Sequence, residues 1–186
     1  AKYAKDINSD PNFNVLSYIS SHDTKLFFGD YQDVALQRRV ANSFMMLPGG
    51  VQIYYGDESG RGLMKDDGVF DQAMRSDMNW SELASGEKAE LVKHWQKLGQ
   101  FRNKHPAIGA GTHAKIADTP YTFSRVRGND KVVVAFGASG AQTISVGSIF
   151  ADGTTVRDFY TGSTATVSGG KVSLTAGGVV LLEAAK

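Results

Sequence analysis

The sequence contains no cysteine, which excludes disulfide bonds, thiolate metal sites and thiol catalysis. It has no apolar run near the roughly 18 residues that a membrane helix needs, so we expect no membrane partner. An excess of charge is also missing: the net charge is +1, which gives no electrostatic signal for nucleic acid or an anionic membrane. The first ten residues, AKYAKDINSD, lack a hydrophobic segment, and we predict no signal peptide there.

The stretch VLSYISSHDT predicts a buried strand over 15–19 that ends in a polar turn at His22 and Asp23. Because ligands bind at the carboxyl ends of parallel strands, this pair is a candidate functional site. From spacing alone, however, a His-Asp pair at a strand end is more often a turn or a helix cap.

Helices and a second strand follow this turn. Asp33 is a candidate N-cap for a helix over 34–46, residues 51–55 predict a second buried strand, and an apolar stripe predicts a helix over 87–103. The strand-helix-strand order predicts one parallel βαβ unit. Two parallel strands cannot close a sheet or cover its edges, so this part packs on something absent from the sequence or is the tail of a larger domain. Exposed sheet edges would promote self-association of the chain alone.

From about Gly111 the composition changes: charges thin out, and short apolar runs alternate with turns. The pattern predicts eight strands between 113 and 183, with hairpin turns at 128–130 and 169–170. Evenly spaced strands without helices are typical of an antiparallel sandwich of Greek-key type.

Several segments resemble, in one order along the chain, the α-amylase family of retaining glycoside hydrolases. SSHDT at 20–24 resembles the family's fourth conserved region, and LPGGVQIYYGDE at 47–58 is similar to its eighth barrel strand. DQAMRSDMNW at 71–80 resembles the loop after that strand, and KLGQFRNKHPAIGAG at 97–111 the last barrel helix and its exit. The resemblance implies an α/β plus all-β chain. Residues 1–110 would be the last two β/α units of a TIM barrel, incomplete alone, and residues 111–186 an antiparallel Greek-key β-sandwich.

The resemblance also implies site residues. Asp23 matches the carboxylate that stabilises the transition state, and His22 the histidine that hydrogen-bonds the same sugar. Asp71 and Arg75 match a pair that binds the neighbouring glucosyl unit, although an i to i+4 Asp/Arg pair is also an ordinary surface ion pair. Other matched positions mainly build and terminate the strand: Tyr54, Tyr55, Gly56 and Glu58.

The family's nucleophile and general acid lie upstream of its fourth conserved region, and nothing before Asp23 resembles them. The resemblance therefore implies part of a glycoside hydrolase that cleaves α-1,4-glucosidic bonds in starch or maltodextrin, inactive as this chain alone. Its partners would be an α-glucan and the missing N-terminal part of the barrel. No cofactor is assigned to this segment, because calcium sites of the family lie upstream. A secreted or periplasmic location follows from the family's usual substrates.

Two other interpretations stay open: a non-catalytic carbohydrate-binding module, and a structural module. Hydrolysis and transglycosylation also remain undistinguished. Trp80, Trp95 and the aromatic residues after Gly111 are candidate sugar platforms, but most of them lie at positions typical of a core. The adjacent Asp57 and Glu58 face opposite ways on a strand, which predicts a structural role. His94 and His105 have no acidic residue at metal-ligand spacing and are predicted to be structural or solvated.

Overall fold

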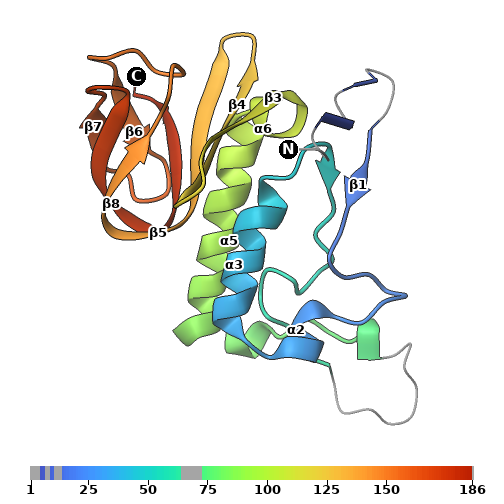
Figure 1. Ribbon diagram of the computed structural model, residues 1–186. Coiled ribbons are helices and arrows are strands. Elements are labelled where there is room, and N and C mark those ends of the chain that lie inside the picture. Colours follow the sequence, from blue (N-terminus) through green and yellow to red (C-terminus); the bar gives the residue numbers. More distant parts are fainter. Residues whose placement is uncertain (1–4, 7–8, 11–13, 64–72, 186) are drawn as a thin grey trace. The chain divides into compact units, whose positions relative to one another are not determined.

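The computed structural model describes residues 5–6, 9–10, 14–63 and 73–185 (Figure 1). The chain divides into two compact units, which are treated separately. The α/β unit comprises Leu16–Met45 and Gly50–Gly99; the sheet unit comprises Ala1–Val15, Met46–Gly49 and Gln100–Lys186. In the described part of the chain, no helix combines the length and the apolar character needed to cross a membrane.

The α/β unit contains a parallel strand pair, as the sequence predicts. Strand β1 (Leu16–Ser17) pairs with β2 (Gly50–Val51) in the register Leu16↔Gly50, and helix α3 (Val34–Met45) lies between them in sequence. Each strand has only two residues, fewer than the predicted 15–19 and 51–55. The shorter pairing has a physical reason: each strand has one hydrogen-bonded neighbour in the described residues, so little holds its ends extended.

The helices of this unit follow their local signals. Asp33 Oδ1 accepts the Leu36 amide at 2.9 Å, which confirms the predicted N-cap of α3. Helix α5 (Gly86–Lys104) buries Trp95, which packs on Phe44 at a ring separation of 6.0 Å. The predicted core role of Trp95 is therefore confirmed. Two short elements were not predicted: α2 (Phe27–Tyr31) and the 3₁₀ turn η1 (Trp80–Glu82).

The sheet unit contains one six-stranded antiparallel sheet in the order β3-β4-β5-β8-β6-β7 (Figure 1). The strands are β3 (Thr112–Ala117), β4 (Tyr121–Arg127), β5 (Asp130–Ser145), β6 (Thr155–Asp158), β7 (Thr164–Thr166) and β8 (Lys171–Ala184). The short helix α6 (Ala107–Ala110) precedes them. The turn between β4 and β5 closes at the pair Arg127↔Asp130, which confirms the first predicted hairpin.

The prediction of eight strands is wrong, because two predicted breaks lie inside continuous strands. β5 and β8 have 16 and 14 residues and pair from Val133↔Leu182 to Ser145↔Lys171. The first break is a shift in register between Phe136 and Ala138, where Gly137 adopts a φ of 73°. The glycine thus bends the strand without ending it. The strands form one sheet, and the Greek-key sandwich stays a prediction.

One face of this sheet encloses the core of the unit. Inward residues come from both halves of β5 and of β8, which places the two halves of the bent sheet around one cluster. Its buried members are Val133, Ala135, Ala138, Ile144, Val146, Phe150, Val156, Val167, Val172, Ala176, Val180 and Leu182.

A buried charge network joins helix and sheet within this unit. His105 contacts Asp130 through Nδ1 and Glu183 through Nε2, each at 2.7 Å. Glu183 also pairs with Lys104 at 2.6 Å and Arg157 at 2.5 Å. Burial alone would raise the pKa of Glu183, but these hydrogen bonds outweigh it and lower that pKa. His105 is structural, as predicted; its acidic partners come from strands 25 and 78 residues away, where local spacing gives no signal.

We predict that Glu183→Gln lowers the free energy of unfolding by about 2–3 kcal/mol at pH 7, because it removes the buried carboxylate on which the contacts of Lys104, His105 and Arg157 converge. The lowered pKa means that the carboxylate stabilises the fold above its unfolded pKa, and that this contribution is lost as the pH falls through the folded value. Urea denaturation at pH 7 and pH 3 measures both effects. Glu90→Gln, which breaks an exposed pair with Lys93, is the control and should leave stability nearly unchanged. Equal losses in the two variants would contradict the prediction.

Candidate functional site

The candidate site lies on the loops that follow β1 and β2. Both ends of the first loop are held by Ser20, whose hydroxyl donates to Asp57 Oδ1 at 2.5 Å and accepts the Phe27 amide at 3.0 Å. Between these points the loop exposes His22 and Asp23. The buried Ser20 thus holds both ends of this exposed polar segment and fixes where the segment leaves the strand.

Asp23 is the meeting point of the site. Its Oδ2 lies 3.1 Å from His22 Nε2, and its Oδ1 accepts from Arg75 Nη2 at 3.2 Å, across 52 residues of sequence. The Ser21 hydroxyl accepts the Asp23 amide at 3.1 Å. The side chains of His22, Asp23 and Arg75 are 57%, 70% and 42% exposed, so these ion pairs add little to stability. The arrangement instead presents a carboxylate and two donors to solvent.

Not every predicted site residue lies in the described part of the chain. Three of the four predicted site residues, His22, Asp23 and Arg75, are brought together. Asp71 lies outside the described residues, so its predicted role stays a prediction.

Asp57 is buried under this loop rather than part of an exposed carboxylate pair. It is 4% exposed, and its Oδ2 accepts the Tyr54 amide at 3.2 Å. Burial raises the pKa of Asp57 to about 6, against the hydrogen bonds from Ser20 and the Tyr54 amide, which lower it. The side-chain amide of Gln37 donates to the Asp57 carbonyl. Ser20 and Gln37 were not singled out from the sequence, since a serine in a turn and a glutamine in a helix are common surface residues.

The aromatic candidates divide by burial. Trp80 is 73% exposed on η1, whereas Phe123 is 2% exposed. Tyr121 and Phe136 pack on Phe123 at ring separations of 5.7 and 5.4 Å, so these side chains support the sheet rather than form an open platform. His94 is buried and contacts the Arg38 carbonyl; burial lowers its pKa to about 4.

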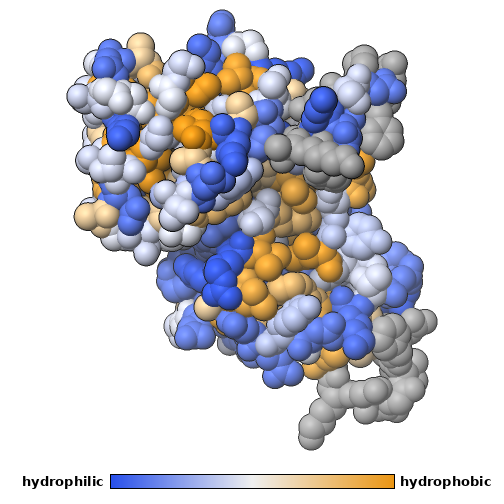
Figure 2. All heavy atoms as spheres, viewed as in Figure 1, coloured by the Kyte–Doolittle hydropathy of each residue, from blue (hydrophilic) through white to orange (hydrophobic). Residues whose placement is uncertain are grey.

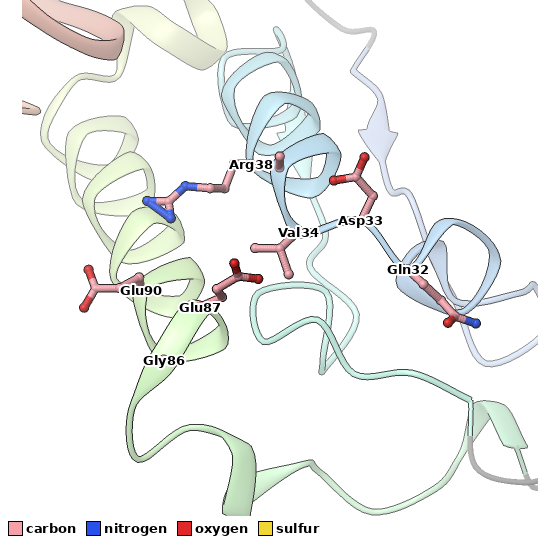
Figure 3. A pocket seen from close by; sticks show the side chains of 8 residues that line it. Gln32, Asp33, Val34, Arg38, Gly86, Glu87 and Glu90 are labelled. Carbon is pink, nitrogen blue, oxygen red and sulfur yellow. The ribbon is translucent and has the colours of Figure 1, made fainter.

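A cavity of about 780 Å³ lies elsewhere in the α/β unit, between the start of α3 and the start of α5 (Figure 3). Figure 3 shows the Glu87 carboxylate turned toward Val34, and Arg38 extending from α3 toward α5. None of the described candidate residues, His22, Asp23 and Arg75, lines this cavity. The site on the loops is therefore an exposed group of polar side chains, distinct from the cavity.

A metal site does not fit the described residues. Among them, no group of three or more His, Cys, Asp or Glu side chains could hold a metal ion. The calcium that the family resemblance raises is therefore not assigned to any residue here.

Comparison with known proteins identifies the family. No family model matches the sequence. Over 127 residues, however, the chain is 47% identical to the "Periplasmic alpha-amylase" of Escherichia coli (strain K12). The match covers 67% of this chain and 18% of that protein. The chain belongs to the α-amylase family.

A second curated protein and a solved structure are also similar to the chain. The chain is 24% identical over 156 residues to "Alpha-amylase 2" of Dictyoglomus thermophilum, a match that covers 81% of the chain and 26% of that protein. Its fold is similar to the solved structure of AmyP in complex with maltose, with a TM-score of 0.68, 16% identity, and coverage of 92% of this chain and 41% of that one. The chain thus spans about a fifth to a quarter of the curated α-amylases it matches and corresponds to a C-terminal segment of the family.

We predict that ionisation of Asp57 destabilises this α-amylase segment as the pH rises. The folded pKa of about 6 lies above the unfolded value, so folding takes up a proton between pH 4 and 6 and stability falls across that interval. Asp57→Asn removes this dependence, and its stability relative to the wild type should rise by about 2 kcal/mol from pH 4 to pH 7. Urea denaturation at both pH values measures the difference.

Asp152→Asn provides a control of opposite sign. Hydrogen bonds from the Gly170 and Gly169 amides lower the pKa of Asp152, so its stabilising effect should shrink as the pH falls. A pH-independent difference between Asp57→Asn and the wild type would contradict the prediction.

Proposed function

We propose that this chain is part of a retaining glycoside hydrolase that cleaves α-1,4-glucosidic bonds in starch or maltodextrin. In this member of the α-amylase family, one observation carries the proposal: the Arg75 guanidinium donates to the Asp23 carboxylate, although the two residues are 52 positions apart in sequence. The parallel β1–β2 pair and helices α3 and α5 would be the last two β/α units of the barrel, and the six-stranded sheet the C-terminal domain.

Asp23 would stabilise the transition state of this reaction. As positive charge develops on the sugar ring, a carboxylate that accepts its hydroxyl protons binds the flattened ring more tightly than the ground state. His22 would donate to the same sugar, and Arg75, with Asp71, would hold the neighbouring glucosyl unit through its fork of donors. A retaining enzyme also needs a nucleophile and an acid about 5–5.5 Å apart. Among the described residues, the side-chain contacts of Asp23 are His22 and Arg75, and the nucleophile and the acid would come from another part of the barrel.

Exposed apolar side chains near β1 and β2 support the proposal that this unit packs against a missing part of the barrel. Leu16 and Tyr18 in and after β1 are 60% and 53% exposed, and Ile53 and Tyr55 after β2 are 41% and 38% exposed. Figure 2 shows hydrophobic residues at the surface in the region of the α/β unit. Exposed apolar side chains beside a two-stranded parallel pair fit a unit of a larger sheet with further parallel strands. Parallel sheets occur almost only in α/β folds in which both faces are covered. The N-terminal part of the same barrel would supply the further strands.

The substrate class and location follow from relatives. A solved structure similar in fold contains maltose, and an α-amylase 47% identical over 127 residues is named periplasmic. An α-glucan ligand and a periplasmic or secreted location are the corresponding proposals for this chain.

We expect this chain alone to be inactive on starch and on a chromogenic maltoside, and to become active when a polypeptide carrying the first six β/α units completes the barrel. In the completed barrel, Asp23→Asn should lower kcat by about 10²–10³-fold, the effect of losing one group that stabilises developing charge. Initial rates with both substrates, with the mass of the assayed chain verified, measure this.

Asp30→Asn is a matched control, because it changes another exposed aspartate, one that pairs with the exposed Lys25. It should leave kcat unchanged. Activity of the chain alone would overturn the proposed division of catalytic residues, and activity of the completed barrel that survives Asp23→Asn would overturn the role of Asp23.

A second prediction concerns the uncovered strands. We expect the chain alone to self-associate with increasing concentration, and Leu16→Asp with Ile53→Asp to reduce this association because both side chains lie along the uncovered pair. Sedimentation velocity over a concentration series measures it. Trp80→Ser, which removes an exposed aromatic side chain on η1, is the control and should not reduce association. A larger effect of the control would show that the strands are not the contact.

A further inference from the structure

Arg61 is a buried arginine whose hydrogen bonds go to main chain near Arg75. It is 2% exposed. Its Nε and Nη2 donate to the Tyr55 carbonyl at 3.1 and 2.9 Å, and Nη2 also donates to the Met74 carbonyl at 3.2 Å. Nη1 donates to the carbonyl and hydroxyl oxygens of Ser76 at 3.2 and 2.7 Å. One guanidinium therefore holds the residues on both sides of Arg75.

Two tyrosines hold the same carbonyls. The Tyr54 hydroxyl donates to the Met74 carbonyl at 3.0 Å, and the Tyr55 hydroxyl donates to the Ser76 carbonyl at 2.9 Å. The guanidinium of Arg61 lies 4.1 Å from the centre of the Tyr55 ring and 5.7 Å from that of Tyr54, within cation–π range. The YYGDE segment thus does more than end a strand, because its rings and hydroxyls complete a clamp on the segment that carries Arg75.

We infer that Arg61 is a positioning residue: by fixing the main chain at Met74 and Ser76, it aims the exposed Arg75 guanidinium at Asp23. This inference rests on the proposed function, in which Asp23 and Arg75 bind sugar. Arg75 is 42% exposed and its contact with Asp23 is 3.2 Å long, so solvent would compete for the pair if the main chain at Arg75 were free to move.

The chemistry of the clamp requires arginine. Three carbonyls and a hydroxyl are satisfied at once by the planar fork of donors, whereas a lysine ammonium is a point charge with three donors on a flexible stem. The packing is close: a Cβ at Gly56, where φ is +103°, would lie 2.5 Å from Arg61 Nε. Burying the Arg61 charge against neutral hydrogen-bond partners costs free energy. A loop that carries this cost is expected to have a geometry that matters for function.

A purely structural role is the alternative, and Arg102 separates the two. This arginine likewise donates to main-chain carbonyls, those of Leu47 and Gly49, but in the sheet unit. Arg102→Lys therefore makes the same chemical change at a partly buried arginine in the unit that does not carry the site. Both lysine variants should lose stability, but Arg61→Lys alone should loosen Arg75.

The first arm of the test uses the 186-residue chain and needs no activity. Nitrogen-15 relaxation should show a rigid Arg75 amide, with an order parameter of about 0.85, in the wild type and Arg102→Lys, and a fall below about 0.6 in Arg61→Lys. Crystal structures should show loss of the 3.2 Å contact between Arg75 and Asp23 only in Arg61→Lys. An unchanged Arg75 in a folded Arg61→Lys protein would overturn the inference.

Tyr55→Phe keeps the test decisive if Arg61→Lys does not fold. It removes only the hydroxyl that donates to Ser76, and it should raise the mobility of the Arg75 amide without unfolding the chain. A rigid Arg75 amide in this variant, with Arg61→Lys unfolded, would assign the clamp to fold stability alone and overturn the inference.

The second arm measures maltotriose kinetics in the completed barrel. Arg61→Lys should raise KM about tenfold and change kcat less than about threefold, because it weakens a contact made in the ground state and the transition state alike. Arg102→Lys should leave the KM-to-kcat balance unchanged. Loss of the Arg75–Asp23 contact without a kinetic effect would refute the proposed sugar-binding role of Arg75, and an inactive wild-type barrel would refute the proposed function. Neither result changes the mobility of Arg75, which the first arm measures independently of activity.

Discussion

The loops of the α/β unit depend on the buried carboxyl group of Asp57. This carboxyl group joins the turn after β1, through Ser20, to the segment after β2, through the Tyr54 amide. The main-chain carbonyl of the same residue accepts from Gln37 and so ties in α3. A two-stranded parallel sheet supplies few main-chain hydrogen bonds of its own, so these polar contacts carry much of the local order. These contacts require Asp57 to be buried, and this burial raises the pKa of its carboxyl group.

The candidate site is built on this arrangement in two layers. The exposed layer, His22, Asp23 and Arg75, contains the groups that would contact sugar. Ion pairs as exposed as these contribute little to holding the three side chains in place. The buried layer beneath it, Asp57 and Arg61, shares no side chain with the exposed one, yet it fixes the main chain from which the exposed groups project. Such a division is expected of a binding site, because groups that must exchange partners with a ligand cannot also serve as its scaffold.

Local signals were enough to predict much of the fold. The cap at Asp33, the apolar stripe around Trp95 and the turn before Asp130 depend on neighbours in sequence, and the structure has all three. The bend at Gly137 was mistaken for a strand end, because a glycine-rich stretch has the same composition in a turn and in a bulge. The contacts of His105 lie 25 and 78 residues away and leave no pattern to detect. The site shows the same limit: motif spacing drew attention to Asp23 and Arg75, whereas Arg61 stands between two glycines in a loop and resembles a solvated residue until the fold surrounds it.

The order of the sheet has a consequence for how this chain is made. β8 lies between β5 and β6, although it follows all the other strands in sequence. During synthesis on the ribosome, the edges of β5 and β6 that pair with β8 therefore remain unpaired until β8 has left the exit tunnel. Before that moment β4 can pair with the first half of β5, up to Phe136, but the second half, Ala138 to Ser145, has no partner strand. The sheet unit should thus mature only after translation has passed Ala184, and until then it presents unpaired strand edges.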